Sequence, residues 1–215
     1  MEALERYIHE HTEAEESLLQ ELDRETHRRM VAPRMLSGHL QGKLLTMLTR
    51  MIRPKAVLEI GTFTGYSALS FAAGLDSGSH IDTIEVDDEL QGLAQSYFDR
   101  SEHGHKIRLH IGSALEIAPT LNTTYDLVFI DGDKREYPDY YRMLMGDGGG
   151  TPLVKSGSFL IADNILWSGK VVEPLARGDR HTAALIEFNR MMVEDPRVEN
   201  VIVPIRDGLN LIRIK

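Results

Sequence analysis

The sequence contains no cysteine among its 215 residues. This absence excludes disulfide bridges, thiolate zinc sites and a thiol nucleophile, and it is compatible with the reducing environment of the cytoplasm. No apolar run approaches the roughly 20 residues that span a bilayer. The first stretch, MEALERYIHEHTEAEE, is acidic and lacks the apolar core of a signal peptide. We therefore expect a cytoplasmic protein that does not enter a membrane.

Basic residues are also scarce relative to acidic ones. Lys and Arg number 24 against 33 Asp and Glu, which gives a formal net charge of −9. Such a chain is a poor match for nucleic acid, because broad nucleic-acid binding needs a basic surface. A local basic strip stays open as an exception, formed by Arg28, Arg29, Arg34, Lys43, Arg50, Arg53 and Lys55.

The composition is that of an ordinary globule, with 42% hydrophobic and 27% charged residues. A chain of this length suits one domain, which we divide into N-terminal helices over residues 1–54 and an α/β core over 55–215. Apolar residues at helical spacing predict a helix or a helix pair from Met1 to about Arg29. Pro33 breaks this pattern, and a further helix is expected from about His39 to Ile52.

From residue 55 onward, strand-like and helix-like segments alternate. This alternation predicts a doubly wound parallel sheet with helices on both faces. The end of the chain differs, because an Asp-Gly pair between two apolar runs indicates a hairpin and therefore an antiparallel last strand. The predicted strands are Ala56–Ile60, Ile81–Val86, Ile107–Ile111, Leu127–Asp131, Phe159–Ala162, Val201–Ile205 and Leu209–Ile214.

A glycine turn follows the first predicted strand, in the stretch VLEIGTFTGYSALS. Gly61 and Gly65 bracket the turn, and the helix after it would offer free N–H groups to a ligand. The Gly-x-x-x-Gly spacing differs from the Gly-x-Gly-x-x-Gly of dinucleotide folds, and no P-loop lysine follows. Glu59, just before the turn, suits a ligand with a cationic group. A nucleotide-like ligand and a merely tight turn both remain open at this point.

Polar residues also follow the other predicted strands, and the carboxyl ends of parallel strands meet at one edge of a sheet. Glu85 could accept both hydroxyls of a ribose, while Ala114 is small enough to let an adenine ring pass. Asp131, Asp163 and Asn164 offer only oxygen ligands, which suit Mg²⁺, Mn²⁺ or Ca²⁺ better than zinc. Any one of these residues alone could be a helix cap or a solvated turn residue, but their convergence predicts a site.

Four stretches together resemble a known family: VLEIGTFTGYSALS, IEVDDE, FIDGDKREYPDYY and IADNILWSGKV. They are similar to the cation-dependent O-methyltransferases, the caffeoyl-CoA and catechol O-methyltransferase group of S-adenosylmethionine-dependent enzymes. The similarity extends over nearly the whole chain, from RMLSGHLQGKLL to PIRDGLNLIRIK. The resemblance implies an α/β, Rossmann-like, doubly wound sheet of seven strands whose last strand is antiparallel, with an N-terminal helical extension. It also implies a homodimer.

The resemblance implies a role for each residue at a matching motif position. S-adenosylmethionine would be the cofactor, and a divalent cation would be a second one, with Mg²⁺ expected first and Mn²⁺ or Ca²⁺ as alternatives. Lys134 matches the proposed general base, and the metal ligands would be Asp131, Asp163 and Asn164. The residues expected around the cofactor are Met35, Ser37, Glu59, Gly61, Phe63, Gly65, Ser67, Glu85, Ala114, Asp131 and Asp133.

The chemistry is coherent, because a divalent cation lowers the pKa of two vicinal hydroxyls and stabilises the attacking oxygen. Lys134 could take the proton; the alternative is a surface lysine paired with Asp133 or Glu136. Trp167 could form a wall of the acceptor pocket or simply pack in the core. Residues 171–180 are expected to form a loop that covers the site.

The expected substrate is a small catechol-type phenol with vicinal hydroxyls. A second hypothesis keeps the chemistry but changes the acceptor to a hydroxylated uridine in tRNA, which the acidic net charge disfavours. A third hypothesis is a non-catalytic regulator that binds the cofactor. Such a regulator would have no need of Asp131, Lys134, Asp163 and Asn164, so their presence argues against it. A dehydrogenase ranks last, because the glycine spacing and the terminal hairpin both disagree with it.

Overall fold

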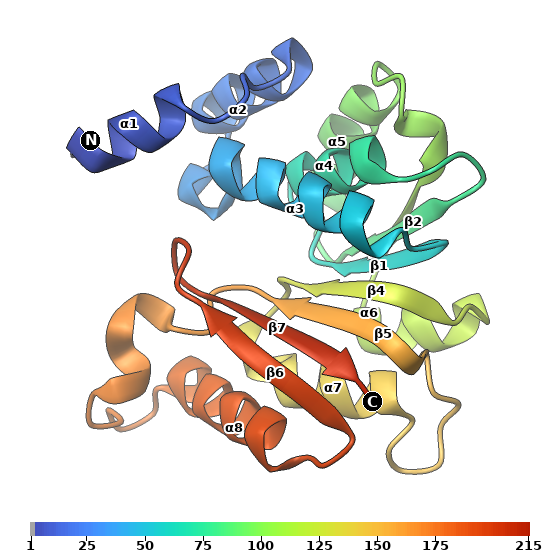
Figure 1. Cartoon of the computed structure of the whole chain (residues 1–215), viewed down its shortest axis with the longest axis vertical. Helices are drawn as coiled ribbons and strands as arrows, with labels where there is room; N and C mark the ends of the chain where they lie inside the picture. The colour runs from blue at the N-terminus through green and yellow to red at the C-terminus, as the bar shows by residue number, and fades with distance from the viewer. Residues whose placement is uncertain (1–2) are drawn as a thin grey trace.

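The structure, a computed structural model, describes residues 3–215 and contains one seven-stranded sheet (Figure 1). The strands lie in the order β3-β2-β1-β4-β5-β7-β6; β7 pairs antiparallel with both β5 and β6, and the other neighbouring strands pair in parallel. This arrangement confirms the predicted doubly wound sheet and its antiparallel last strand. The strands are β1 Ala56–Ile60, β2 His80–Glu85, β3 Ile107–Ile111, β4 Tyr125–Ile130, β5 Val154–Ala162, β6 Val198–Val203 and β7 Leu209–Ile214.

Helices pack on both faces of the sheet. The α-helices are α1 Ala3–Glu10, α2 Ser17–Arg29, α3 Gly38–Ile52, α4 Tyr66–Gly74, α5 Gln91–Phe98, α6 Ala114–Ile117, α7 Tyr137–Met145 and α8 Arg180–Glu194. Short 3-10 turns are η1 Pro33–Met35, η2 Asp88–Leu90, η3 Gly104–Lys106, η4 Ala118–Leu121, η5 Lys134–Glu136 and η6 Trp167–Val172. In Figure 1, α3, α4 and α5 lie on one side of the sheet, and α7 and α8 lie on the other.

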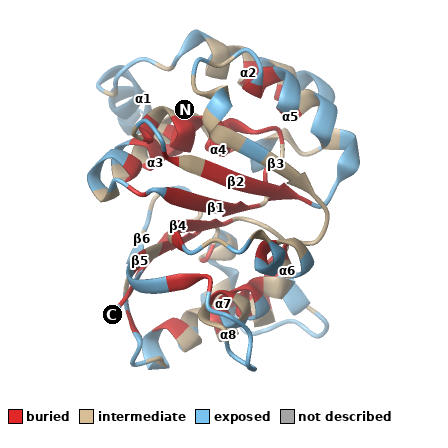
Figure 2. Ribbon diagram, turned by 90° about the vertical axis from the view of Figure 1, so that its right-hand side faces the viewer, coloured by how far each residue is buried: buried red, intermediate tan, exposed pale blue. Residues whose placement is uncertain are grey.

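Two hydrophobic clusters hold these layers together, because successive strand residues point to opposite faces. In β1, Val57 joins the cluster of α2 to α5, whereas Leu58 joins the cluster of α6 to α8. Figure 2 shows the buried residues concentrated along the central strands and the inner sides of the helices. A strand that is buried on both faces must be apolar throughout, which explains the continuous apolar runs in the sequence.

The observed strands agree with the predicted ones except at some ends. β1, β3 and β7 have the predicted bounds, while β2 ends at Glu85 and leaves Val86 exposed. β4 ends at Ile130, so Asp131 lies in the loop after it.

The predicted starts of β5 and β6 were wrong. β5 begins at Val154 because it continues through an irregularity, where the Ser158 hydroxyl donates to the Tyr125 carbonyl at 2.8 Å. β6 covers Val198–Val203, and Pro204 cannot extend its ladder because proline lacks an N–H.

The N-terminal segment is a helix pair, although Met1 and Glu2 of the predicted range lie outside the described residues. Helix α1 buries none of its residues, whereas α2 packs on the core. The buried Thr26 hydroxyl of α2 lies 2.9 Å from the Thr64 hydroxyl in the β1–α4 turn. Within residues 3–215, no helix combines the length and apolarity needed to cross a membrane.

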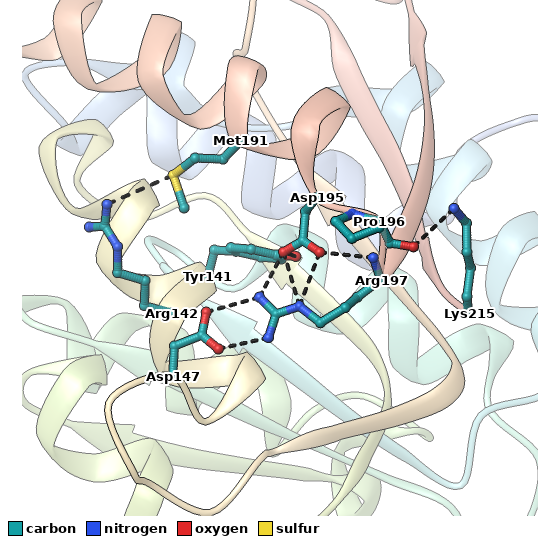
Figure 3. Close-up of polar contacts among 8 residues, drawn as sticks. All are labelled: Tyr141, Arg142, Asp147, Met191, Asp195, Pro196, Arg197 and Lys215. Carbon is teal, nitrogen blue, oxygen red and sulfur yellow. Dashed lines mark hydrogen bonds and ion pairs between the residues drawn. The ribbon is translucent and has the colours of Figure 1, made fainter.

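An ion-pair cluster lies where β5 and β6 begin, at the amino edge of the sheet (Figure 3). The Arg197 guanidinium pairs with both oxygens of Asp147, at 2.7 and 3.0 Å, and with Asp195 at 2.7 Å. The Tyr141 hydroxyl donates to Asp195 at 2.8 Å. Arg197 therefore ties the α7–β5 loop to the start of β6.

Replacing Arg197 with Met should lower the free energy of unfolding at pH 7 by roughly 1 kcal/mol, since partly exposed ion pairs are weak. Arg197 holds the pKa of Asp195 at about 2 and the pKa of Asp147 below its usual range. Carboxyls with a depressed pKa stabilise the fold above their unfolded pKa of roughly 4, and this contribution is lost as pH falls through the folded pKa.

Urea unfolding at pH 7 and pH 3 tests this expectation. The difference in the free energy of unfolding between wild type and Arg197→Met should be smaller at pH 3 than at pH 7. Arg213→Met is the matched control, because Arg213 makes an exposed pair with Glu199 in the β6–β7 hairpin. Equal stability of wild type and Arg197→Met at pH 7 would contradict the assigned role.

Candidate active site

The segments that follow the parallel strands are bonded to one another at the carboxyl edge of the sheet. Each backbone N–H just past one strand donates to the last or penultimate carbonyl of its neighbour. These bonds are Gly112 to Glu85 at 2.8 Å, Gly61 to Ile84 at 2.9 Å, Asp131 to Ile60 at 2.8 Å, and Asp163 to Ile130 at 3.0 Å. The convergence of strand ends that the sequence predicted is therefore observed.

Lys134 is a buried lysine, so the alternative of a surface lysine paired with Asp133 or Glu136 was wrong. Its Nζ donates to Asp131 Oδ1 at 2.6 Å and to the Tyr137 hydroxyl at 2.8 Å. Only 8% of the lysine is exposed. The short turn η5 begins at Lys134 and directs its side chain back toward the end of β4. The structure thus places one ammonium group directly against a predicted metal ligand.

Asp163 is the most buried of the predicted metal ligands, with 3% of it exposed. Its Oδ1 accepts the Asn164 backbone N–H and its Oδ2 accepts the Gln41 side-chain amide, both at 2.6 Å. Burial, together with repulsion from Asp131, raises the pKa of this carboxyl to about 6. Asn164 has a φ of +57°, in the left-handed region that Asn tolerates better than most residues.

The donor set at this edge fits a hard divalent cation. Asp131, Asp163 and Asn164 contribute two carboxylates and one amide oxygen, the ligand types that Mg²⁺ and Ca²⁺ accept. Over residues 3–215, no group of three or more His, Cys, Asp or Glu side chains is arranged to hold a metal ion. Cation binding here would therefore depend on the amide of Asn164 as well as on the two carboxylates.

The glycines of the β1–α4 turn have a structural reason that the sequence did not reveal. A Cβ on Gly61 would lie 2.5 Å from the Asp131 carbonyl oxygen, and a Cβ on Gly65 would lie 2.6 Å from the Phe98 ring. Both residues also have a positive φ, of +100° and +94°. The turn needs glycine so that β4 and α5 can pack against it, and close approach of a ligand is not required to explain either position.

Glu59 is fully buried within β1. Its Oε2 accepts the hydroxyl of Thr83, whose oxygen in turn contacts the hydroxyl of Thr62. Within the described chain, Oε1 has no hydrogen-bond partner. Burial raises the pKa of Glu59 to about 8, and the neighbouring hydroxyls of Ser67 and Thr83 offset only part of that rise. A buried carboxyl oxygen without a partner is costly, and a ligand with a cationic group would remove that cost.

Glu85 is buried beside the glycine turn and already makes two hydrogen bonds to the backbone. Its carboxylate accepts the N–H of Phe63 at 2.7 Å and the N–H of Asp87 at 3.0 Å. Each carboxylate oxygen has a second lone pair, so these bonds leave room for two ribose hydroxyls. The contact with Phe63 also fixes the turn, where Phe63 has a φ of +49°.

The remaining predicted cofactor residues lie around this edge with different exposure. Ala114 is buried in the first position of α6, and Asp133 is partly exposed and pairs with Arg135. Ser37 is buried just before α3, whereas Met35 at the end of η1 is 59% exposed. The Met35 side chain therefore does not pack into the protein interior.

Trp167 lies in the segment after β5 and is partly buried. Its ring stacks on His181 of α8, with 5.9 Å between ring centroids and an interplanar angle of 15°. It also packs against the cluster of α6 to α8, in line with the packing alternative, and its place in the wall of an acceptor pocket stays a prediction. The loop of residues 173–179 that follows η6 is largely exposed.

Sequence reasoning missed two polar residues that support the site. Gln41 of α3 is buried and contacts Asp163, and its Oε1 has no partner in the described chain. Tyr137 is also buried, and its hydroxyl accepts from Lys134 and lies 2.9 Å from the Asp163 carbonyl oxygen. The available signal was spacing: Gln41 lies four residues before the buried Leu45, and Tyr137 lies three residues after Lys134.

The chain is similar to known proteins over almost its full length. A model of the O-methyltransferase family matches residues 9–215. The caffeoyl-CoA O-methyltransferase of Petroselinum crispum is 32% identical over 184 residues, which cover 80% of this chain and 74% of that enzyme. The caffeoyl-CoA O-methyltransferase 2 of Eucalyptus globulus is 33% identical over 184 residues, which cover 80% of this chain and 72% of that enzyme.

A solved structure gives the same likeness in three dimensions. The O-methyltransferase TomG from Streptomyces achromogenes, which is involved in tomaymycin synthesis and was solved in complex with SAM, is 27% identical with a TM-score of 0.88. The match covers 100% of this chain and 99% of TomG.

The raised pKa of Glu59 leads to a test of the site without any ligand. A carboxyl whose pKa is raised on folding favours the folded state below its unfolded pKa, and this advantage is lost as pH rises through the folded pKa. The wild-type free energy of unfolding should therefore fall between about pH 5 and pH 8. Glu59→Gln has no proton to lose, so it should exceed wild type in stability at pH 8 by on the order of 2–4 kcal/mol.

Chemical denaturation of the ligand-free protein at pH 5 and pH 8 measures this difference. Glu199→Gln, a change at an exposed residue, serves as the control, and its free energy of unfolding should change between the two pH values as that of wild type does. A Glu59→Gln protein that loses stability with pH as steeply as wild type would contradict the assignment.

Proposed function

The chain belongs to the O-methyltransferase family, and on that basis we propose that it methylates a small catechol-type phenol with the help of a divalent cation. As an S-adenosylmethionine-dependent O-methyltransferase, it takes the methyl group from that cofactor. The observation that supports this function most is the pairing of the buried Lys134 with the half-buried Asp131, near the buried carboxyl of Asp163. The same edge of the sheet also holds Glu59, a buried glutamate with an unpaired oxygen.

The cofactor would bind along the ends of β1, β2 and β3. The unpaired oxygen of Glu59 suits the ammonium of the methionine moiety, and Glu85 suits the ribose hydroxyls. The methionine moiety would also contact Gly61, Phe63, Gly65 and Ser67. Ala114 and Asp133 would border the cofactor, with Met35 and Ser37 above it.

Asp131, Asp163 and Asn164 would hold the divalent cation, with Mg²⁺ expected first and Mn²⁺ or Ca²⁺ as alternatives. Bound there, the ion would lower the pKa of two vicinal hydroxyls of the acceptor and orient them. Gln41 supports the site by fixing one oxygen of Asp163.

Lys134 is the proposed general base, and it can take a proton only as a neutral amine, a form that the charge of a cation held by Asp131 would favour. The proton that leaves the acceptor hydroxyl would be held on Nζ, where Asp131 and the Tyr137 hydroxyl are both within hydrogen-bond distance. In the displacement, the oxygen–carbon bond forms while the carbon–sulfur bond of the sulfonium breaks in line with it. Correct placement of the two reactants could lower the barrier by about 7–11 kcal/mol. Trp167, stacked on His181, would form a wall of the acceptor pocket.

The alternatives have less support. Much of the basic strip that could attract tRNA is already paired with carboxylates: Arg28 and Arg29 with Glu25, Lys43 with Glu13, and Arg53 with Asp76. A non-catalytic regulator disagrees with the enzyme class of the family, and a dehydrogenase disagrees with the antiparallel β7. The homodimer and the cytoplasmic location stay predictions.

Asp163→Ala should lower kcat at least 100-fold while the Kd for S-adenosylmethionine stays within a few-fold, because Asp163 would contact the cation and not the cofactor. Transfer from labelled S-adenosylmethionine to catechols and to total tRNA, with Mg²⁺ and with a chelator, measures the turnover. Asp139→Ala, which removes an exposed carboxylate of α7, is the control. Unchanged turnover of Asp163→Ala, or a wild-type rate that the chelator does not alter, would overturn the metal proposal.

Lys134→Ala should lower kcat at neutral pH by roughly 10²–10⁴-fold, the usual contribution of a positioned base. The rate should recover partly at higher pH, where hydroxide in solution can remove the proton. The pH profile of kcat measures both effects, with Lys155→Ala as the control, since Lys155 is an exposed lysine paired with Asp126. A wild-type rate at neutral pH would show that no lysine base is needed.

A further inference from the structure

The turn between β6 and β7 contacts a loop that is distant in the sequence. The Arg206 guanidinium donates to the Leu36 carbonyl at 2.8 Å and to the Arg34 carbonyl at 3.3 Å. These carbonyls belong to residues 33–37, the loop expected above the cofactor. Figure 1 shows the turn extending beyond the sheet toward the segment that precedes α3.

The same turn also contacts the loop that follows β5. The Asp207 carboxylate accepts the Ser168 backbone N–H at 2.6 Å, and the Asp207 carbonyl accepts the N–H of Leu166 at 3.0 Å. The Gly208 carbonyl accepts the N–H of Ile165 at 3.3 Å. A Cβ on Gly208 would lie 2.5 Å from the Leu166 side chain, so the two segments are in close contact.

The backbone of the turn is arranged to make these contacts. Arg206 has a φ of +50°, which is unusual for a residue with a long side chain. Strained positions of this kind persist where the surrounding contacts hold them, and they occur often at functional sites. Arg206 directs its guanidinium out of the hairpin, whereas Arg213 of the same hairpin pairs with Glu199 inside it.

We propose that Arg206 and Asp207 are positioning residues. They hold residues 33–37, above the proposed cofactor site, and residues 164–168, beside the proposed acceptor site, at a fixed separation. The inference rests on the proposed function, which places the cofactor below residues 33–37 and the acceptor beside residues 164–168. Neither side chain needs to touch a substrate. Arg206 sets how well the cofactor is held, and Asp207 sets how well the acceptor is aligned, because small misplacements of reactants reduce rates strongly.

Hydrogen exchange of the protein without ligands tests the structural part. Arg206→Ala should speed exchange in peptides that cover residues 33–37, where the N–H of Leu36 bonds to Pro33. Asp207→Ala should speed exchange at Ser168, which loses its acceptor. Arg213→Ala should change neither region. Exchange in both loops that stays at wild-type rates would overturn the proposal whether or not the protein methylates a catechol.

Binding and kinetics test the functional part. Arg206→Ala should raise the Kd for S-adenosylhomocysteine about tenfold, while kcat at saturating cofactor stays within about threefold. Asp207→Ala should leave that Kd within about twofold and lower kcat for the acceptor about tenfold. Asp207→Asn, which keeps an acceptor for Ser168, should restore most of the rate.

The results that would contradict the proposal are distinct from a failure of the proposed function. If Arg206→Ala and Asp207→Ala alter Kd and kcat no more than Arg213→Ala does, the turn only stabilises the hairpin. If the wild-type protein transfers no methyl group to any catechol, the proposed acceptor is wrong. In that case the exchange rates and the Kd for S-adenosylhomocysteine still decide the role of the turn.

Discussion

Buried carboxyl groups at the carboxyl edge of the sheet, which are costly to ionise there, are the constraint on which the site depends. Glu59 and Asp163 are almost fully buried and Asp131 is half-buried, and within residues 3–215 only Lys134 forms an ion pair with any of them. Burial raises the pKa of Glu59 to about 8 and, with the charge of Asp131, raises that of Asp163 to about 6. A cationic ligand would favour the ionised form of these carboxyls, and the proposed cofactor and divalent ion both meet that requirement.

The rest of the fold keeps these groups in place. Bonds from each strand end to its neighbour fix the spacing of the segments, and Gly61 lets β4 approach the turn after β1. Helix α3 contributes Gln41 from one side, and the turn after β4 contributes Lys134 from the other. The β6–β7 turn then connects the two loops above the edge. The site is thus supported by segments from the whole length of the chain.

The sequence predicted the architecture well because strand and helix periodicities are local properties. It located the glycine turn, the acidic strand ends and the terminal hairpin for the same reason. It misjudged the start of β5, because this strand pairs with β4 on both sides of an irregularity, where a Ser158 hydroxyl bond that no periodicity shows is made. It left ligand approach and a merely tight turn open as reasons for Gly61 and Gly65, and the structure adds packing against Asp131 and Phe98, which the sequence could not show.

Contacts between distant segments could not be predicted in this way. Nothing in the neighbourhood of Gln41 indicates that it meets Asp163, and nothing near Arg206 indicates that it meets Leu36. The partner of Lys134 was also uncertain, since Asp131, Asp133 and Glu136 all lie within reach in sequence, and only the fold selects Asp131.

The most direct test of the central claim is the number of protons exchanged when S-adenosylmethionine binds. Calorimetric titration at pH 7 in buffers of different ionisation enthalpy measures that number. Because ligand-free Glu59 holds a proton at this pH and would give it up to face an ammonium group, the account predicts release of on the order of one proton per cofactor bound. Binding without proton release would contradict the claim that the buried carboxyl of Glu59 ionises to meet a cationic ligand.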